Sequence, residues 1–208
     1  MASLAVPLQR NSTRKWQRNR TDPSPWRKLH WSVSDERCVP IEDMESNFGN
    51  ADRGFLQRYG VVDAHRHPWP TMQSDDLPQA ARNFEASWRS QFGSETCFDL
   101  CFLGMGDDCH TASLFPSSSL LLDEPNEWFA AVEVPGKGWR FSVTKAGLAN
   151  SSQIVVTVTG QSKATALREA LHGPYDPINK PVQNIREVAR RTVWLVDPLA
   201  GNKLSGVR

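Results

Sequence analysis

The segment FDLCFLGMGDDCHTASLFP, residues 98–116, carries most of the information about the fold. Its first part, residues 98–103, is apolar enough to form a strand that is buried on both faces, as in parallel sheets. Gly104 and Gly106 then allow the backbone to turn tightly and to approach a ligand closely. Because ligands of open parallel sheets bind beyond the carboxyl ends of the strands, the segment predicts both a parallel sheet and a site at its edge.

The end of the same segment supplies candidate acid–base residues. His110 can take a proton from water near neutral pH, and the carboxylate of Asp108 can orient its ring and stabilise the resulting imidazolium. An alternative is that His110 only caps a helix or satisfies a backbone group. The Gly-x-Gly pattern does not complete a dinucleotide-binding fingerprint, so it indicates no nucleotide cofactor.

From Leu29 onward, short apolar runs alternate with helix-like stretches, which is typical of α/β proteins. A chain of 208 residues with 39% hydrophobic composition buries one substantial core, so we expect a single doubly wound α/β domain with a mainly parallel sheet. The predicted strands are residues 29–33, 98–103, 128–132, 140–144, 153–158 and 192–196, with a turn at Pro135, Gly136 and Gly138. The predicted helices are residues 74–92, opened by Ser74, Asp75 and Asp76, and residues 162–171, with Ser162 as the N-cap.

Charge is balanced over the whole chain but not along it. Lys and Arg total 24 against 23 for Asp and Glu, so the chain lacks the basic excess of a nucleic-acid-binding protein. Up to Trp31, however, seven bases oppose one acid, which gives a net charge of +6. We expect residues 1–25 to be a solvated basic tail, with an organelle transit peptide or a phosphate-binding arm as alternatives, and residues 26–208 to form the α/β domain.

The apolar runs and the cysteines indicate the cellular compartment in which the protein is expected. No run reaches the length of a bilayer span, and the first residues lack the apolar core of a secretory signal, so we expect a cytoplasmic protein without a membrane partner. The four cysteines show no disulfide spacing, and free thiols are the expectation. A zinc site built from Cys97, Cys101, Cys109 and His110 fits structural zinc spacings poorly. His65 and His67, close to two prolines, are expected in an exposed loop.

A second polar segment, VSDERCVP at residues 33–40, follows a predicted strand. The planar guanidinium of Arg37 is suited to gripping a phosphate. The alternative is a surface ion pair between Arg37 and Asp35 or Glu36.

Taken together, the two segments resemble the signatures of 6-phosphogluconolactonases. The matching motifs are Asp-Glu-Arg-Cys-Val-Pro followed by Ser46-Asn47, and Gly-Met-Gly-x-Asp-x-His-Thr-Ala-Ser-Leu-Phe-Pro. The similarity continues in family order through residues 139–144, 155–164 and 194–197, and it covers about residues 26–204.

The resemblance implies hydrolysis of 6-phospho-D-glucono-1,5-lactone to 6-phosphogluconate in the oxidative pentose phosphate pathway. It implies no metal and no organic cofactor, a sugar-phosphate lactone as the partner, and a monomer or weak homodimer. The family's catalytic histidine falls on His110, and its substrate and phosphate contacts fall on Arg37, Arg140 and Lys163. The backbone between Gly104 and His110, or a nearby cation, is the expected source of stabilisation for the oxyanion.

Two departures from the family bear on activity. Residues 4–14 resemble only a faint remnant of the family's first strand and its Gly-Gly-Ser-Thr-Pro loop, so the domain either retains that strand or lacks it together with the preceding helix. Ser12 and Thr13 are all that matches the loop, and its paired glycines are absent. Cys109 replaces the family glycine before His110; if the position needs a positive φ, strain of roughly 1 to 2 kcal/mol is expected and activity should be weak.

Two alternative functions stay open. A catalytically weak or dead relative could still bind sugar phosphates, which the altered loop and Cys109 favour. A glucosamine-6-phosphate deaminase-like isomerase would share the Gly-x-Gly-x-Asp-x-His region, but the continuation Thr-Ala-Ser-Leu-Phe-Pro argues against it.

Overall fold

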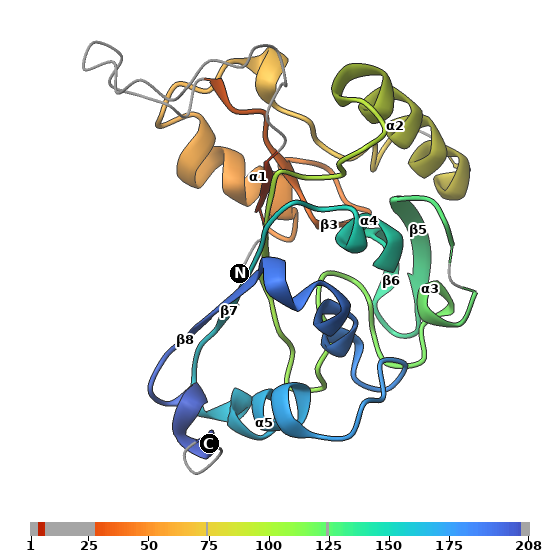
Figure 1. The fold of residues 1–208 in the computed structure, drawn as a ribbon. Coiled ribbons are helices and arrows are strands. Elements are labelled where there is room, and N and C mark those ends of the chain that lie inside the picture. The colour runs from red at the N-terminus through yellow and green to blue at the C-terminus, as the bar shows by residue number, and fades with distance from the viewer. Residues whose placement is uncertain (1–3, 7–27, 74, 124, 205–208) are drawn as a thin grey trace.

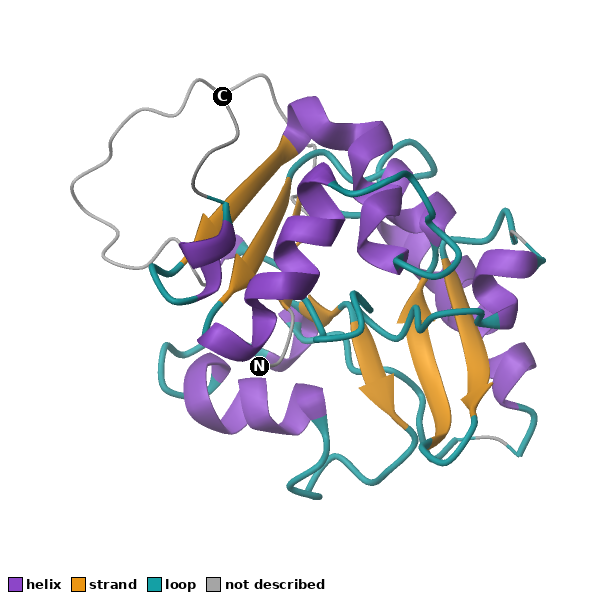
Figure 2. Ribbon diagram, turned by 90° about the horizontal axis from the view of Figure 1, so that it is seen from below, coloured by secondary structure: helices purple, strands orange, loops and turns teal. Residues whose placement is uncertain are grey.

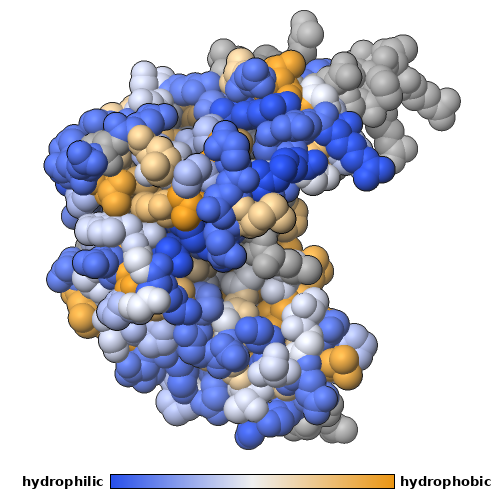
Figure 3. Space-filling view, turned by 180° about the vertical axis from the view of Figure 1, so that it is seen from behind, coloured by the Kyte–Doolittle hydropathy of each residue, from blue (hydrophilic) through white to orange (hydrophobic). Residues whose placement is uncertain are grey.

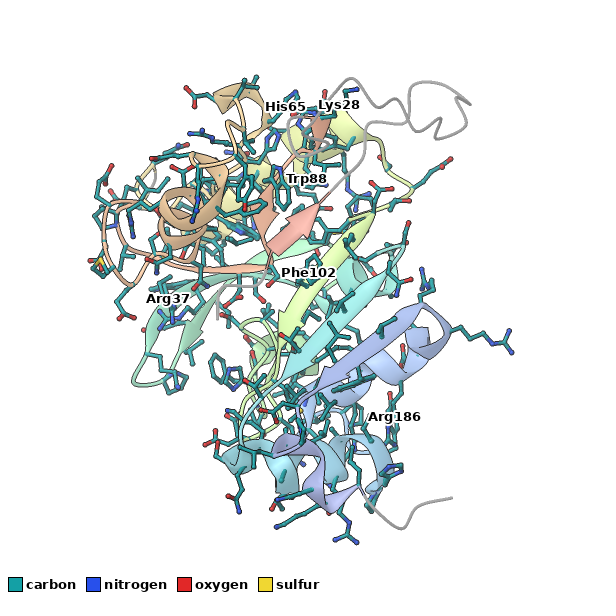
Figure 4. All side chains as sticks on the ribbon, turned by 90° about the vertical axis from the view of Figure 1, so that its left-hand side faces the viewer. Lys28, Arg37, His65, Trp88, Phe102 and Arg186 are labelled. Carbon is teal, nitrogen blue, oxygen red and sulfur yellow. The ribbon has the colours of Figure 1, made fainter. Side chains whose placement is uncertain are left out.

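The computed structural model describes residues 4–6, 28–73, 75–123 and 125–204. Within these residues the strands form a five-stranded sheet, in the order β2-β1-β4-β7-β8, and a three-stranded sheet, in the order β3-β6-β5. The two groups of strands are seen apart in Figure 2, and Figure 4 shows one face of β4, β7 and β8 with no helix in front of it. The strands are β1 (Leu4–Val6), β2 (Ser32–Val33), β3 (Asp35–Arg37), β4 (Leu100–Gly104), β5 (Phe129–Val134), β6 (Gly138–Val143), β7 (Ile154–Val158) and β8 (Thr192–Val196). The α-helices are α1 (Asn47–Ala51), α2 (Leu77–Phe92), α3 (Ser119–Leu122), α4 (Lys145–Ala149) and α5 (Ala164–His172).

The parallel part of the larger sheet confirms the α/β prediction. β4 pairs with β7 and β7 with β8, all in parallel, with Leu103 opposite Val156 and Val156 opposite Trp194. Leu103, Ile154 and Val156 are almost fully buried, but the alternate residues of β4 and β7 are only partly buried. Val193 and Leu195 of β8 are 47% and 52% exposed, so the expectation of strands buried on both faces was wrong for this sheet. The predicted strand at residues 192–196 has the bounds of β8.

β1 occupies the place beside β4. Its three residues pair antiparallel with β4 on one side and with β2 on the other. Of the two alternatives for the amino terminus, the structure therefore has a strand at this position, and the sheet edge beside β4 is paired. Ser12, Thr13 and most of the basic residues of the amino-terminal segment lie outside the described residues.

The smaller sheet is antiparallel and was only partly foreseen. The hairpin of β5 and β6 turns at the predicted position, where Gly136 and Gly138 both have positive φ. The residues Asp35–Arg37, expected in a loop, form β3 instead and pair with β6. α2 packs on β5, as Figure 1 shows, and places Trp88 and Phe84 against Phe129.

Several element boundaries differ from the prediction for identifiable reasons. α2 begins at Leu77 because Asp76, not Ser74, is the N-cap that accepts a hydrogen bond from Gln79 N, and Ser74 lies outside the described residues. The helix expected from Ser162 opens with a 3₁₀ turn, Gln161–Lys163, and α5 follows without a side-chain cap.

The segment around His65 and His67 is not an exposed loop. Trp31 N donates to His65 O, and His67 N donates to Trp31 O, which ties the segment to the strand region. The rings of His65 and His67 pack on His30, which is 4% exposed, and His30 Nδ1 lies 2.8 Å from His67 Nε2. The prediction was wrong because these contacts join residues that lie more than thirty positions apart.

Two further observations concern the described part of the chain. None of its helices has the length and apolarity needed to cross a membrane. The surface seen from behind is mostly hydrophilic, with apolar side chains in small separate groups (Figure 3).

Candidate active site

A cavity of about 570 Å³ opens at the carboxyl ends of β4 and β7. Arg37 comes to it from β3, His110 from the loop after β4, and Lys163 from the turn before α5. Both sheets contribute to the site, because Arg37, labelled in Figure 4, lies on the antiparallel sheet, and Gly104 and Thr157 lie on β4 and β7 of the larger sheet. The structure thus brings together five of the predicted site residues, since Gly104 and Gly106 line the same cavity. The full lining is Asp35, Arg37, Asn47, Asn50, Gly104, Met105, Gly106, His110, Ala112, Thr157, Thr159 and Lys163.

The His110 imidazole is held by Asp108. His110 Nδ1 lies 2.6 Å from Asp108 Oδ1, and the same oxygen accepts a hydrogen bond from His110 N at 3.0 Å. Burial acts to raise the pKa of Asp108, but the hydrogen bonds and charge of His110 lower it overall, so the carboxylate is the stable form. Because the Asp108 carboxylate lies at Nδ1, a neutral imidazole carries its proton on Nδ1. The lone pair of Nε2 can then accept a proton, so that His110 acts as a base.

Two neighbours confine the imidazole ring. Phe115 stacks on it with a centroid separation of 4.4 Å and an angle of 29° between the planes. Gly106 also lies against the ring and leaves no room for a side chain, since a Cβ there would lie 2.1 Å from His110 Nδ1. Phe115 and Gly106 both belong to residues 98–116, but their contacts with the ring are seen only in the structure.

Cys109 has a φ of 64°, so the positive φ considered from the sequence is present. Its side chain is 5% exposed, and its Sγ donates to Ala166 O at 3.4 Å. Despite this strained neighbour, His110 lines the cavity and contacts Asp108.

Arg37 and Asn47 form the opposite wall. Arg37 NH1 donates to Asn47 Oδ1 at 3.0 Å and to Glu45 O at 2.5 Å. The expected alternative, a surface ion pair of Arg37 with Asp35 or Glu36, is wrong: the carboxylate nearest to the guanidinium is that of Glu45, at 4.0 Å. Asp35 instead accepts hydrogen bonds from Ser113 Oγ at 2.9 Å and Ser34 Oγ at 3.2 Å, and burial raises its pKa.

The two other predicted cations differ in position. Lys163 lines the cavity and has Nζ 4.0 Å from Asp107 Oδ1. Arg140 is the cross-strand partner of Arg37 but is not among the lining residues, and its NH1 donates to Trp139 O. Burial and the charge of Arg37 lower the pKa of Arg140.

Several cavity residues were missed by sequence analysis. Thr157 and Thr159 stand at the carboxyl end of a correctly predicted strand, so the rule that found His110 would have found them as well. Asn47 was noticed only as part of a motif. Asn50 lies one turn further along α1, and no sequence signal pointed to it.

The thiols and histidines give no metal site. All four cysteines, which lie in the described part of the chain, are free. Among the described residues, no group of three or more His, Cys, Asp or Glu side chains is arranged to hold a metal ion.

The fold and this site define an α/β enzyme domain with a histidine–carboxylate pair and cations around one cavity. The chain belongs to the family described as Glucosamine-6-phosphate isomerases/6-phosphogluconolactonase, whose model matches residues 8–194. Within that family it is similar to 6-phosphogluconolactonase of Synechocystis sp., at 33% identity over 184 residues that cover 86% of this chain and 75% of the relative. The enzyme of Mycobacterium tuberculosis is 32% identical over 187 residues, with 86% and 74% covered. These matches confirm the family resemblance seen in the sequence.

A solved structure agrees with this placement. The 6-phosphogluconolactonase from Thermotoga maritima superposes with a TM-score of 0.68 and 27% identity, covering 84% of this chain and 75% of that one. The family match begins at residue 8, inside the basic amino-terminal segment. The domain boundary at residue 26 stays a prediction.

Proposed function

We propose that this protein hydrolyses 6-phospho-D-glucono-1,5-lactone to 6-phosphogluconate, with His110 as the general base. The observation that carries the proposal is the common cavity of Arg37, His110 and Lys163. The similarity to 6-phosphogluconolactonases over most of the chain supports the choice of substrate over an amino sugar phosphate.

The reaction needs little beyond an activated water molecule, because the lactone carbonyl is already electrophilic. Nε2 of His110 takes a proton as the water oxygen bonds to the carbonyl carbon, and the carbonyl oxygen becomes an oxyanion. When the oxyanion collapses, the bond from the carbonyl carbon to the ring oxygen breaks, and the imidazolium returns its proton to that oxygen. Asp108 stabilises the imidazolium between the two transfers. Gly104 and Gly106 line the cavity beside His110, but the N–H of Gly106 already donates to His110 O. We propose that another backbone N–H between Gly104 and His110, or a nearby cation, stabilises the oxyanion.

The phosphate would bind among the cations. Arg37 and Arg140 lie directly opposite each other on β3 and β6, and like charges in that register repel unless an anion lies nearby. A dianionic phosphate supplies that anion and suits the planar guanidinium group. Lys163 adds a positive charge from another wall of the cavity, next to the start of α5.

The proposal extends to the protein's setting. The chemistry described requires no metal or organic cofactor. We propose that the protein acts in the oxidative pentose phosphate pathway, in the cytoplasm. We propose a monomer or weak homodimer, as the family resemblance implies. We propose that Arg140 also contacts the phosphate, beside Arg37.

A second candidate, a catalytically weak or dead relative that binds sugar phosphates, is favoured by the positive φ at Cys109. A lactone-hydrolysis assay separates the two candidates. The parent chain should exceed the spontaneous rate measured in buffer, and His110→Ala should fall to that rate. His172→Ala, which changes an exposed histidine at the end of α5, should behave as the parent. A parent chain that only matches the spontaneous rate, or a fully active His110→Ala variant, would remove His110 hydrolysis as the function.

A further inference from the structure

Glu36 is a buried carboxylate immediately behind the cavity wall. It is 2% exposed, and it is not one of the lining residues. Each of its oxygens accepts two hydrogen bonds: Oε1 from Arg37 N at 2.8 Å and Asn47 N at 2.7 Å, and Oε2 from Ser46 Oγ at 3.0 Å and Phe48 N at 2.7 Å. A charged carboxylate offers about four acceptor sites, so the group is fully used.

These four bonds join the two elements that form the Arg37 wall. One element is β3, through the backbone of Arg37, and the other is the start of α1, through the backbones of Asn47 and Phe48. The side chains complete the connection, because Arg37 NH1 donates to Asn47 Oδ1 and Asn47 Nδ2 donates to the backbone oxygen of Asp35. Glu36 therefore holds in place both ends of the contact between Arg37 and Asn47.

The hydrogen bonds around Glu36 favour the ionised form. Three of the four partners are backbone N–H groups, which can only donate, and a proton on Oε1 would meet two of them; only Ser46 Oγ could accept a proton from Oε2. Burial raises the pKa of Glu36, and the four hydrogen bonds act in the opposite direction. An amide in its place would turn an NH₂ group toward two of the donors.

Since Glu36 lines no part of the cavity, its effect on a ligand must pass through other residues. We infer that Glu36 is a positioning residue, whose carboxylate fixes Arg37 and Asn47 in the geometry that binds the phosphate of the substrate. This inference rests on the proposed function for the identity of the phosphate ligand. It predicts that a change at Glu36 acts on recognition of the phosphate more than on the chemical step at His110.

Glu85 provides a matched control. It is 7% exposed, and it accepts hydrogen bonds from Trp128 N at 2.8 Å and Phe129 N at 3.1 Å, away from the cavity. Glu36→Gln and Glu85→Gln therefore both disturb a buried carboxylate that binds backbone N–H groups. Both should lower the melting temperature, but only Glu36→Gln should affect phosphate recognition.

The test compares two substrates and one product. For Glu36→Gln we expect KM for the 6-phospho lactone to rise about tenfold or more, with kcat within a few-fold of the parent and KM for unphosphorylated glucono-1,5-lactone nearly unchanged. The dissociation constant of 6-phosphogluconate, measured by calorimetry, should rise by a similar factor. Ser46→Ala, which removes one of the four donors, should shift both constants in the same direction by less, and it serves if Glu36→Gln does not fold.

The outcomes separate the two proposals. Unchanged KM and product affinity in Glu36→Gln, or in Ser46→Ala if the first variant does not fold, would overturn the positioning role. An equal rise in KM for both lactones, or a rise of the same size in Glu85→Gln, would overturn the positioning role as well. A parent chain that binds 6-phosphogluconate without hydrolysing the lactone would refute the proposed catalysis, and the calorimetric comparison would still decide the role of Glu36. A parent chain that does not bind 6-phosphogluconate would overturn both.

Discussion

Replacing Gly106 by alanine tests how strictly the position of the His110 ring determines the rate. A Cβ at Gly106 would lie 2.1 Å from His110 Nδ1 and 2.4 Å from both His110 Cε1 and Asp108 Oδ1. Non-bonded heavy atoms settle at about 3.5 Å or more, so the ring and its carboxylate must move by about 1 Å. They are the groups that would perform and support the proton transfer.

The displacement converts into an expected loss of rate. A misplacement of about 1 Å in a catalytic group costs roughly 10²-fold, which corresponds to about 2.7 kcal/mol in the activation free energy. We expect Gly106→Ala to lower kcat for lactone hydrolysis by that factor. KM should change less, because Arg37 and Lys163 reach the cavity from other elements.

Gly54→Ala is the control. Gly54 is exposed and outside the cavity lining, and a Cβ there would meet no atom within 4 Å. Its kcat should stay close to that of the parent, and both variants should unfold cooperatively as a folded domain does. If Gly106→Ala retains kcat within a few-fold, or if Gly54→Ala loses as much, the close confinement of His110 does not control the rate.

Two further changes probe the same site, and a third probes the packed rings of His30 and His67. Asp108→Asn should lower kcat by about 10²-fold or more, since the imidazole loses its 2.6 Å carboxylate partner, whereas Asp107→Asn should change kcat far less; equal losses would contradict the pairing. Cys109→Gly should raise kcat by relieving strain at a φ of 64°, and a rate at or below that of the parent would show that Cys109 is not limiting. Burial lowers the pKa of His30 and of His67 to about 4, while both titrate near 6.5 in an unfolded chain. The unfolded state therefore binds the protons first as the pH falls, and stability that is complete above about pH 6.5 should decline toward pH 4. Urea unfolding at pH 7 and pH 5 measures the decline, and His30→Gln should flatten it; an equally steep decline in that variant would assign the effect to other groups.

The sequence was sufficient where the signal was local. His110 and Asp108 are two residues apart, so their contact follows from a short loop, and the strand at residues 192–196 carries an uninterrupted β-forming run. The strand-end rule for ligands of this fold indicated the segments of Arg37 and His110. Lys163 was expected beside them only because of the family resemblance, and all three line the cavity.

The sequence was insufficient where burial depends on distant partners. Asp35, Glu36 and Arg37 contain no apolar residue, and their strand exists because α1 and Ser46 satisfy the carboxylate of Glu36. Likewise His65 and His67 have polar, proline-rich neighbours, and their packing comes from His30. A hydrophobic pattern cannot report a polar group that is buried with its partners.

The cavity takes part of its wall from each of the two sheets, with Arg37 on one side and Thr157 on the other. A sugar phosphate bound there would contact both sheets, and its binding free energy would add to the free energy needed to separate them. Backbone amides of β3 and β7 should then slow their deuterium uptake together on titration with 6-phosphogluconate, although no strand of one sheet is paired with a strand of the other in the described chain.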